Sequence, residues 1–236
     1  MNVMGTAALI FALATGGAYA TTIYNETFTG QEGKGAIGST VDTTGVDWTI
    51  DLGDANLLAD NDQFAVLVND GGFTVRDTNA GCNNSACSGT RPNFVDVVLP
   101  MWLSPIIDIT NFIQVGFIVD VSGSGGFELT GGVGSQDSFL IELLIDGVSV
   151  VVDDVLGKLT ADEVANGFDF QTGQPFGNFS GSTAQFKISA NTYASSEILG
   201  FDNVNLFGVP TAVPLPASGW LLFGAFGALG LRRRLR

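Results

Sequence analysis

The sequence contains no histidine among its 236 residues. Histidine is the commonest general base, the usual partner of a nucleophilic serine or cysteine, and the commonest ligand of transition metals. Its absence argues against zinc hydrolases and against enzymes that use a catalytic triad. No nucleophile motif is present either. The sequence therefore predicts a protein that is not an enzyme.

Cysteine is nearly absent as well. The two cysteines, Cys82 and Cys87, lie in the polar stretch GCNNSACSG. A two-cysteine metal site would need two further ligands, and no histidine is there to supply them. Two cysteines this close in a loop rich in Gly, Ser and Asn are typical of a small-loop disulfide in an oxidising compartment. We therefore favour a Cys82–Cys87 disulfide over a metal site.

Positive charge is scarce over most of the chain. All 24 acidic residues lie between Glu26 and Asp202, and this interval holds five basic residues, so its formal charge is 5 − 24 = −19. A domain with this charge is repelled by phosphate backbones and by anionic lipid surfaces, which argues against nucleic-acid binding. Its carboxylates would either bind divalent cations or keep an exported protein soluble, and solubility is the more general explanation.

Glycine and short apolar runs are abundant instead. The 32 glycines, together with Asn, Asp, Ser and Thr, recur between short runs of Val, Ile, Phe and Leu. This sequence pattern is typical of strands that alternate with turns. In VDWTIDL (46–52) apolar and polar residues alternate, as in a strand with one buried face, and 113–121 and 139–145 repeat that spacing. Further strands are predicted at 23–28, 64–68, 72–76, 94–99, 148–152, 184–189 and 198–207.

One short helix is expected among these strands. Thr160 followed by Glu163 is a capping box, and Gly167 stands where the helix would end. Gly-rich links at 123–126 and 131–135 fit hairpin loops rather than linkers between domains. We therefore predict an all-β fold: a single β-sandwich, jelly-roll-like, over residues 21–209 with one short insert helix.

The first twenty residues differ from this body. Their apolar stretch (7–14) is too short to span a bilayer, and Ala18-Tyr19-Ala20 has the small-x-small form of a signal-peptidase site. A buried helix is the alternative, since the segment lacks the usual Lys or Arg near its start. Because an acidic, strand-rich domain follows at once, we predict a secretory signal peptide (1–20) that is cleaved after Ala20.

The C-terminal segment 210–236 combines prolines, an apolar run and arginines. From Val213 to Leu231 there are 19 residues without a charge, close to the shortest length that crosses a bilayer. The positive-inside rule places the end of the chain in the cytoplasm, which agrees with an exported N-terminus. We predict a C-terminal transmembrane helix here, stopped in the membrane by Arg232, Arg233, Arg234 and Arg236.

This segment resembles a PEP-CTERM sorting signal, in the variant that carries VPLPA in place of Pro-Glu-Pro. The motif is Val213, Pro214, Leu215, Pro216 and Ala217, the apolar run is 218–231, and the basic end is RRRLR. The resemblance covers only the end of the chain, so it implies nothing about the ligand of the β-sandwich. A plain C-terminal membrane anchor is the alternative.

The resemblance implies a Gram-negative protein that is exported by the general secretory route and cut by signal peptidase. The precursor would be anchored in the inner membrane until an exosortase-type membrane protease recognises and processes its tail. Members of the family are typically surface or secreted proteins of bacteria that make extracellular polysaccharide, and many are linked to biofilm. We therefore expect a structural or adhesive role in the cell envelope or extracellular matrix.

Calcium is the first candidate ligand of the body. Hard cations need several oxygen ligands, and jelly-roll modules often hold Ca²⁺ where terminal strands meet. Glu26 lies on the first predicted strand and Asp202 on the last, so pairing of these strands would bring them close, and Asp60 and Asp62 lie in an oxygen-rich turn. Asp and Asn also cap turns routinely, which is the alternative explanation.

Carbohydrate is the second candidate, and would make the body a carbohydrate-binding module. Sugars are bound by exposed aromatic faces and planar hydrogen-bonding side chains. The candidates are Trp102, Tyr24 and Tyr193, whereas Trp48 lies on the apolar face of its strand and is expected in the core. A secreted hydrolase ranks third, because among 24 acidic residues some pair satisfies any carboxylate spacing.

Overall fold

The structure is a computed structural model that describes residues 19–37, 40–51, 64–69, 71–77, 101–127, 129, 137–177, 179, 181–192 and 196–211. Residues 20–210 form one compact unit. The VPLPA motif, the arginine cluster, the two cysteines and nearly all of the predicted signal peptide lie outside the described residues. Within the described residues, no helix is long and apolar enough to span a membrane.

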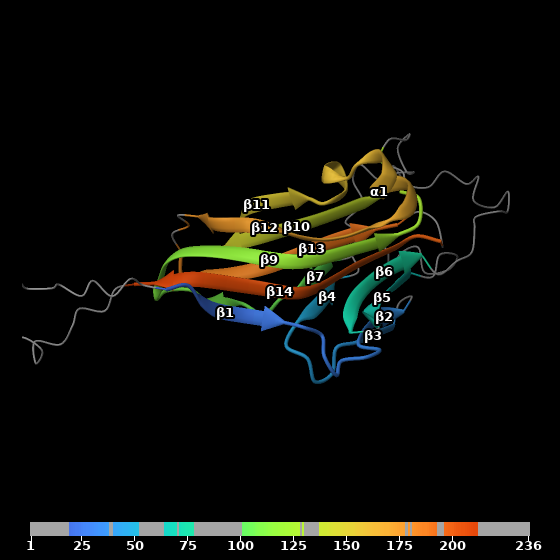
Figure 1. Ribbon diagram of the computed structural model, residues 1–236. Coiled ribbons are helices and arrows are strands. Elements are labelled where there is room, and N and C mark those ends of the chain that lie inside the picture. The colour runs from blue at the N-terminus through green and yellow to red at the C-terminus, as the bar shows by residue number, and fades with distance from the viewer. Residues whose placement is uncertain are drawn as a thin grey trace, which may run out of the picture. The chain divides into compact units, whose positions relative to one another are not determined.

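Most of the described residues belong to two antiparallel sheets (Figure 1). The larger contains β1 (Thr21–Glu26), β2 (Gly35–Ile37), β3 (Thr40–Asp42), β5 (Phe64–Asn69), β6 (Gly72–Asp77), β9 (Phe112–Ser124), β12 (Phe168–Gly177) and β14 (Ile198–Pro210). The smaller contains β4 (Thr49–Asp51), β7 (Met101–Leu103), β8 (Ile107–Asp108), β10 (Ser138–Ile145), β11 (Val148–Asp154) and β13 (Thr183–Asn191).

The strand order places β9 and β14 side by side in the larger sheet. Its order is β12-β9-β14-β6-β5-β2-β3, with β1 paired to β14 as well. The smaller sheet has the order β11-β10-β13-β7-β4, with β8 paired to β13. As Figure 1 shows, β12 lies beyond β9 and β1 lies against β14.

Aromatic side chains from both sheets meet in one core. Phe201 of β14 packs against Trp102 of β7 and Phe139 of β10, with ring centroids 5.6 and 6.4 Å apart. Phe117 of β9 meets Phe186 of β13 edge-on, with centroids 5.4 Å apart. All five side chains are buried. The two sheets therefore pack face to face as a β-sandwich.

The alternating patterns predicted most of these strands. Strands are present at 23–28, 64–68, 72–76, 113–121, 139–145, 148–152, 184–189 and 198–207 with shifted ends, and Trp48 is buried as its pattern predicts. The predicted ranges leave out the two- and three-residue strands β2, β3, β7 and β8, and also β12, whose sequence FDFQTGQPFG mixes glycine, glutamine and proline with its aromatics. The predicted strand at 94–99 lies outside the described residues, and the jelly-roll connectivity stays a prediction.

The predicted helix is present with the expected caps. The helix α1 (Ala161–Asn166) begins after Thr160, which forms both hydrogen bonds of a capping box with Glu163. It ends at Gly167, whose φ of +98° favours glycine. With the short 3₁₀ helix η4 (Leu156–Lys158), α1 connects β11, at one edge of the smaller sheet, to β12, at one edge of the larger.

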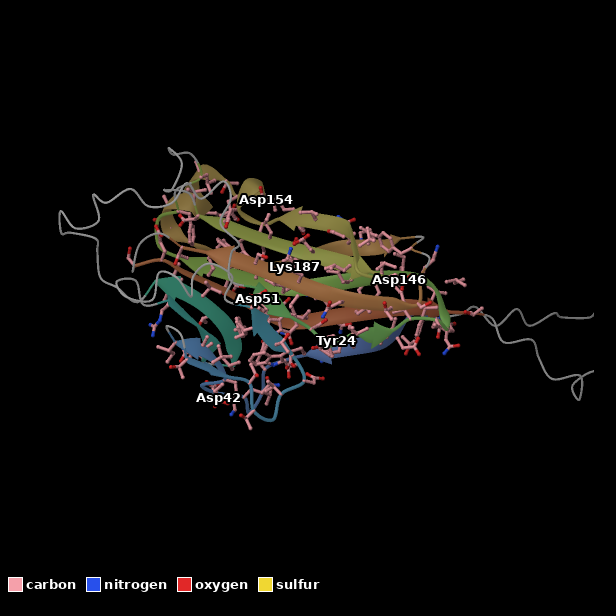
Figure 2. The ribbon with its side chains drawn as sticks, turned by 180° about the vertical axis from the view of Figure 1, so that it is seen from behind. Tyr24, Asp42, Asp51, Asp146, Asp154 and Lys187 are labelled. Atoms are coloured by element: carbon pink, nitrogen blue, oxygen red, sulfur yellow. The ribbon has the colours of Figure 1, made fainter. Side chains whose placement is uncertain are left out.

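Polar side chains hold the strands of the smaller sheet in register. Asp146, at the turn between β10 and β11, accepts hydrogen bonds from the backbone N–H groups of Ser182 and Thr183 at 3.0 and 2.9 Å (Figure 2). These bonds lower the pKa of the Asp146 carboxyl. On β13, Lys187 forms an ion pair with Glu142 of β10, with Nζ and Oε2 2.7 Å apart. The hairpin β10–β11 is thus tied to β13.

An ion pair between a buried carboxylate and a half-exposed lysine joins the edge strands of the two sheets. Asp153 of β11 is only 3 % exposed; it forms a salt bridge with Lys158 and accepts a hydrogen bond from Thr172 Oγ1 of β12 at 2.7 Å. Lys158 Nζ also donates to Thr172 Oγ1 at 2.9 Å. Because a buried carboxylate without partners is strongly disfavoured, these three residues hold β11 and β12 together.

We expect Lys158→Met to lower the free energy of unfolding by about 2 to 4 kcal/mol, because it leaves the buried Asp153 carboxylate without its cation. Chemical denaturation of the wild type and the variant measures this loss. Lys34→Met is the matched control: Lys34 pairs at 2.9 Å with the exposed Asp42, so its loss should change stability little. Equal losses from the two variants would contradict the role of the buried Asp153 carboxylate.

Candidate functional site

The outer face of the larger sheet carries two adjoining hollows over β12, β9 and β14. Their volumes are about 540 and 390 Å³, and both are lined by Ile118, Gln171 and Phe207. The first is otherwise lined mainly by polar residues: Thr22, Asn25, Asp120, Asn203 and Asn205. The second is lined further along β12 by Gly173, Gln174, Pro175 and Phe176. Together the two hollows form a groove with a polar and an aromatic part.

Three polar side chains form a row across this groove, from β12 through β9 to β14. Gln171 Nε2 donates to Asp120 Oδ1 at 2.8 Å, and Asn203 Nδ2 donates to Asp120 Oδ2 at 2.7 Å. The strand register places Gln171 opposite Asp120. Asp120 therefore orients both amides, and each amide keeps an oxygen and a second N–H that can bind a ligand.

A β-bulge in β14 brings Asn203 into this row. The register between β14 and β9 shifts between Asp202 and Asn205, and Asn203 has a left-handed φ of +48°. Asparagine adopts this conformation more readily than most residues. The neighbour of β14 changes at the same place, because β6 pairs with residues up to Phe201 and β1 pairs from Val204 onward.

An aromatic pair lines the second hollow. Phe207 of β14 and Phe176 of β12 meet edge-on with ring centroids 5.0 Å apart, and Phe176 is 40 % exposed. The Phe207 ring lies over Gly116 of β9, where an added Cβ would come within 2.6 Å of the ring. Glycine at position 116 therefore lets the ring lie close against the sheet, and the pair offers an aromatic surface to the groove.

One buried acceptor at the groove has no hydrogen-bond partner among the described residues. Asn205 lines the first hollow, and its side-chain Oδ1 is buried without a hydrogen bond. An unsatisfied buried acceptor is unfavourable unless water or a ligand donates to it. The groove therefore retains unused capacity to accept a hydrogen bond.

Two carboxylates lie side by side on this face of the sheet. Asp202 of β14 is the cross-strand partner of Asp120 in β9. Burial raises the pKa of the Asp202 carboxyl; the Asn203 backbone N–H opposes this rise, and the charge of Asp120 adds to it. Among the described residues that line the two hollows there is no lysine or arginine. The groove is therefore acidic.

The raised pKa of Asp202 predicts that Asp202→Asn increases the stability of the folded protein, by an amount that depends on pH. Because the folded-state pKa of Asp202 is raised, its carboxyl lowers stability as the pH rises from its unfolded-state pKa, about 3.9, through the folded-state value. The amide oxygen of the variant would still accept the hydrogen bond from the Asn203 N–H, which lies 2.7 Å from Asp202 Oδ1. We expect Asp202→Asn to raise the melting temperature at neutral pH and to change it little near about pH 3, where the carboxyl is protonated in both states.

Asp108→Asn is the control of opposite sign. Hydrogen bonds from the backbone and side chain of Thr110 lower the pKa of the exposed Asp108 carboxyl, so its loss should lower the melting temperature at neutral pH. Thermal unfolding followed by circular dichroism over a pH series measures both variants. A lower melting temperature for Asp202→Asn at neutral pH would contradict the raised pKa of the Asp202 carboxyl.

Glu26 and Asp202, the two predicted calcium ligands that the structure describes, do not lie together. β1 and β14 pair as expected, but Glu26 lies opposite the buried Val204 and shares its inward face, whereas Asp202 lies on the outer face with Asp120. Glu26 Oε1 accepts hydrogen bonds from Phe28 N at 2.7 Å and from a glutamine side chain at 3.0 Å. Within the described residues, no cluster of three or more acidic or cysteine residues could hold a metal ion. Asp60 and Asp62 lie outside them.

Two of the three predicted sugar-contacting residues are described. Trp102 is 1 % exposed and packs against Phe28 and Phe201, so its prediction as a surface aromatic was wrong: β7 lies within the smaller sheet and turns the indole into the core. Tyr24 is partly buried, its hydroxyl has no hydrogen-bond partner in the described part of the chain, and burial raises its pKa. Tyr193 lies outside the described residues.

The sequence-based search missed the aromatic residues of the groove. Phe176 lies on β12, which no alternating pattern predicts, and Phe207 lies at an outward position of a predicted strand. A signal was present in DNVNLF (202–207), where Val204 and Leu206 point inward and Phe207 takes an outward position. An aromatic residue at an outward position of an alternating strand is the feature that identifies such a surface.

No protein-family model matches the chain, and a comparison with curated proteins gives no match. Solved structures resemble it weakly. The adhesin domain of Lys-gingipain from Porphyromonas gingivalis matches over 80% of this chain and 99% of that chain, at 8% identity and a TM-score of 0.42. The family 22 carbohydrate-binding module of Clostridium thermocellum Xyn10B matches over 82% of this chain and 96% of that chain, at 12% identity and a TM-score of 0.34. A cyclase from Fischerella sp. TAU matches over 83% of this chain and 100% of that chain, at 13% identity and a TM-score of 0.41. Such low similarities identify no ligand for this chain.

Proposed function

We propose that this chain is an exported, non-catalytic β-sandwich that binds extracellular polysaccharide in the groove of its larger sheet, as an adhesive or structural component of a bacterial envelope or matrix. The supporting observation is that the aromatic pair Phe176 and Phe207 adjoins the row formed by Gln171, Asp120 and Asn203. The apolar face of a sugar ring packs on an aromatic ring, and its hydroxyls bond to amides and carboxylates.

The charge of the groove narrows the class of polysaccharide. Asp120 and Asp202 lie side by side, and no described lysine or arginine lines the two hollows to offset them. A polymer that carries uronic acids or other anionic groups would be repelled from this surface. The favoured ligand is therefore a polysaccharide without acidic groups.

The same two carboxylates are the observation that favours a second candidate, a glycoside hydrolase. A carboxyl with a raised pKa beside a second carboxyl group is an arrangement that glycoside hydrolases use for a general acid and its partner. Both oxygens of Asp120 already accept hydrogen bonds from amides, which favours a binding role for this residue. Release of reducing sugars that is abolished by Asp202→Asn would support the hydrolase instead.

The termini supply the proposal for delivery. We infer that residues 1–20 are removed by signal peptidase, and that the tail 210–236 holds the precursor in the inner membrane of a Gram-negative cell. The VPLPA motif at 213–217 would then be the substrate of an exosortase-type protease. The support is the resemblance of the tail and its agreement in orientation with an exported N-terminus.

We expect Phe176→Ala to weaken binding of an uncharged polysaccharide about tenfold, because a central aromatic contact contributes more than about 1 kcal/mol. Affinity electrophoresis of the purified protein in gels that contain cellulose derivatives, xylan or soluble chitin measures this loss. Val152→Ala, at a residue 61 % exposed on β11 of the other sheet, is the control and should bind as the wild type does. Unchanged binding by Phe176→Ala would place the site elsewhere, and a protein that binds no glycan would refute the function.

Mass spectrometry of the protein from its native host tests the delivery proposal. We expect a mature N-terminus at Thr21 and loss of the arginine cluster, because processing follows the signal-peptidase site and the VPLPA motif. Replacing Pro214 and Pro216 by alanine should leave the N-terminal cut unchanged and block the C-terminal one. A mature wild-type protein that still ends in RRRLR would rule out exosortase processing.

A further inference from the structure

A third hollow continues the groove beyond Asp120. Its volume is about 480 Å³, and Asp120 lines both this hollow and the first one. It lies on the same outer face, where Gly72 and Thr74 come from β6, Ser122 from β9, and Gly200 and Asp202 from β14. The three hollows are therefore neighbours along one pair of strands, on both sides of the row that Asp120 forms with Gln171 and Asn203.

The strand register gives the length of this extended groove. On β9 it runs from Gly116, which faces Phe207, to Ser122, which faces Gly200. These positions are six residues apart in the sequence, and a strand rises about 3.3 Å per residue, so the groove is on the order of 20 Å long. A ligand that fills it must be longer than a single sugar residue.

A glycine keeps the third hollow open. An added Cβ on Gly72 would lie 3.5 Å from the Phe201 carbonyl oxygen and 3.8 Å from Asp202 Cβ, which are ordinary contact distances, and the φ of Gly72 lies outside the left-handed region. Neither the backbone nor the neighbouring atoms require glycine at this position. What glycine provides there is free space above the sheet.

We propose that the third hollow is a further subsite of the polysaccharide groove, so that the protein binds an internal stretch of several sugar residues in an uncharged chain. A ligand that occupies the hollows on both sides of the polar row must extend from it in both directions, as the interior of a polymer does. Asp169 and Asp202 line the third hollow with Asp120, whereas Arg76, two residues beyond Thr74, does not line it. Three carboxylates line this end and Arg76 does not, so a polyuronate is disfavoured here as well. The inference rests on the proposed function.

The test is a titration calorimetry series with oligosaccharides from cellulose, xylan and chitin, each from the disaccharide to the hexasaccharide. For the series that binds, we expect the wild type to bind the hexasaccharide at least about tenfold more tightly than the disaccharide, since added sugars fill added subsites. Gly72→Leu should bind the disaccharide as the wild type does and lose this gain with length, because its side chain fills the third hollow. Polygalacturonate should bind neither protein.

Two controls separate this inference from folding defects. Ser149→Leu places a leucine at an exposed position of β11 on the other sheet and should bind every oligosaccharide as the wild type does. If thermal unfolding shows that Gly72→Leu is misfolded, Ser122→Leu, at an exposed position in the same hollow, takes its place.

The possible failures are distinguishable. The further subsite would be overturned if the wild type bound the disaccharide and the hexasaccharide equally well. It would also be overturned if the variant that fills the third hollow kept the full gain in affinity with length. The proposed function would then still be tested by Phe176→Ala. Tight binding of polygalacturonate would overturn the assignment of an uncharged ligand. If no series binds at any length, the proposed function fails and this inference fails with it.

Discussion

The antiparallel pairing of β9 with β14 is the interaction on which both the core and the groove depend. Alternate residues of these strands, among them Val119, Val121, Val204 and Leu206, are buried between the sheets. The residues between them face outward and line the groove. Because side chains alternate between faces with a period of two, a slip of one residue would exchange the two sets. The register that builds the core therefore also sets the order of polar and aromatic residues in the groove.

Several unfavourable features gather within four residues of β14. Asn203 has a left-handed backbone, Asp202 carries a raised pKa beside Asp120, and Asn205 has a buried acceptor without a partner. The bulge that contains them also lies where the neighbour of β14 changes from β6 to β1. A fold selected for stability alone would have no reason to concentrate these features at one place. Such concentrations are typical of binding sites, where the ligand satisfies the groups that the protein leaves unsatisfied.

Local patterns predicted the framework better than the site. Alternation over 113–121, 139–145 and 198–207 and the capping box at Thr160 each depend on neighbours within a few residues, and these predictions hold. The polar row depends instead on contacts between residues 51 and 83 positions apart, so only the sheet order brings its members together. Trp102 was misassigned for a related reason: a three-residue strand is too short for its pattern to show which face is buried.

The lysines of the described residues pair with carboxylates away from the groove, whereas the carboxylates of the groove are held by hydrogen bonds. Lys158 pairs with the buried Asp153, and Lys187 pairs with Glu142 on the smaller sheet. Lys34 pairs with Asp42 of β3, an edge strand of the larger sheet. The lysines of the described residues are thus engaged away from the groove, and Asp120 is held by amides rather than by a cation. Amide donors fix the carboxylate in place without cancelling its charge. The surface therefore combines hydrogen-bonding groups held in fixed positions with carboxylates that disfavour anions, and the proposed uncharged polysaccharide would meet both conditions.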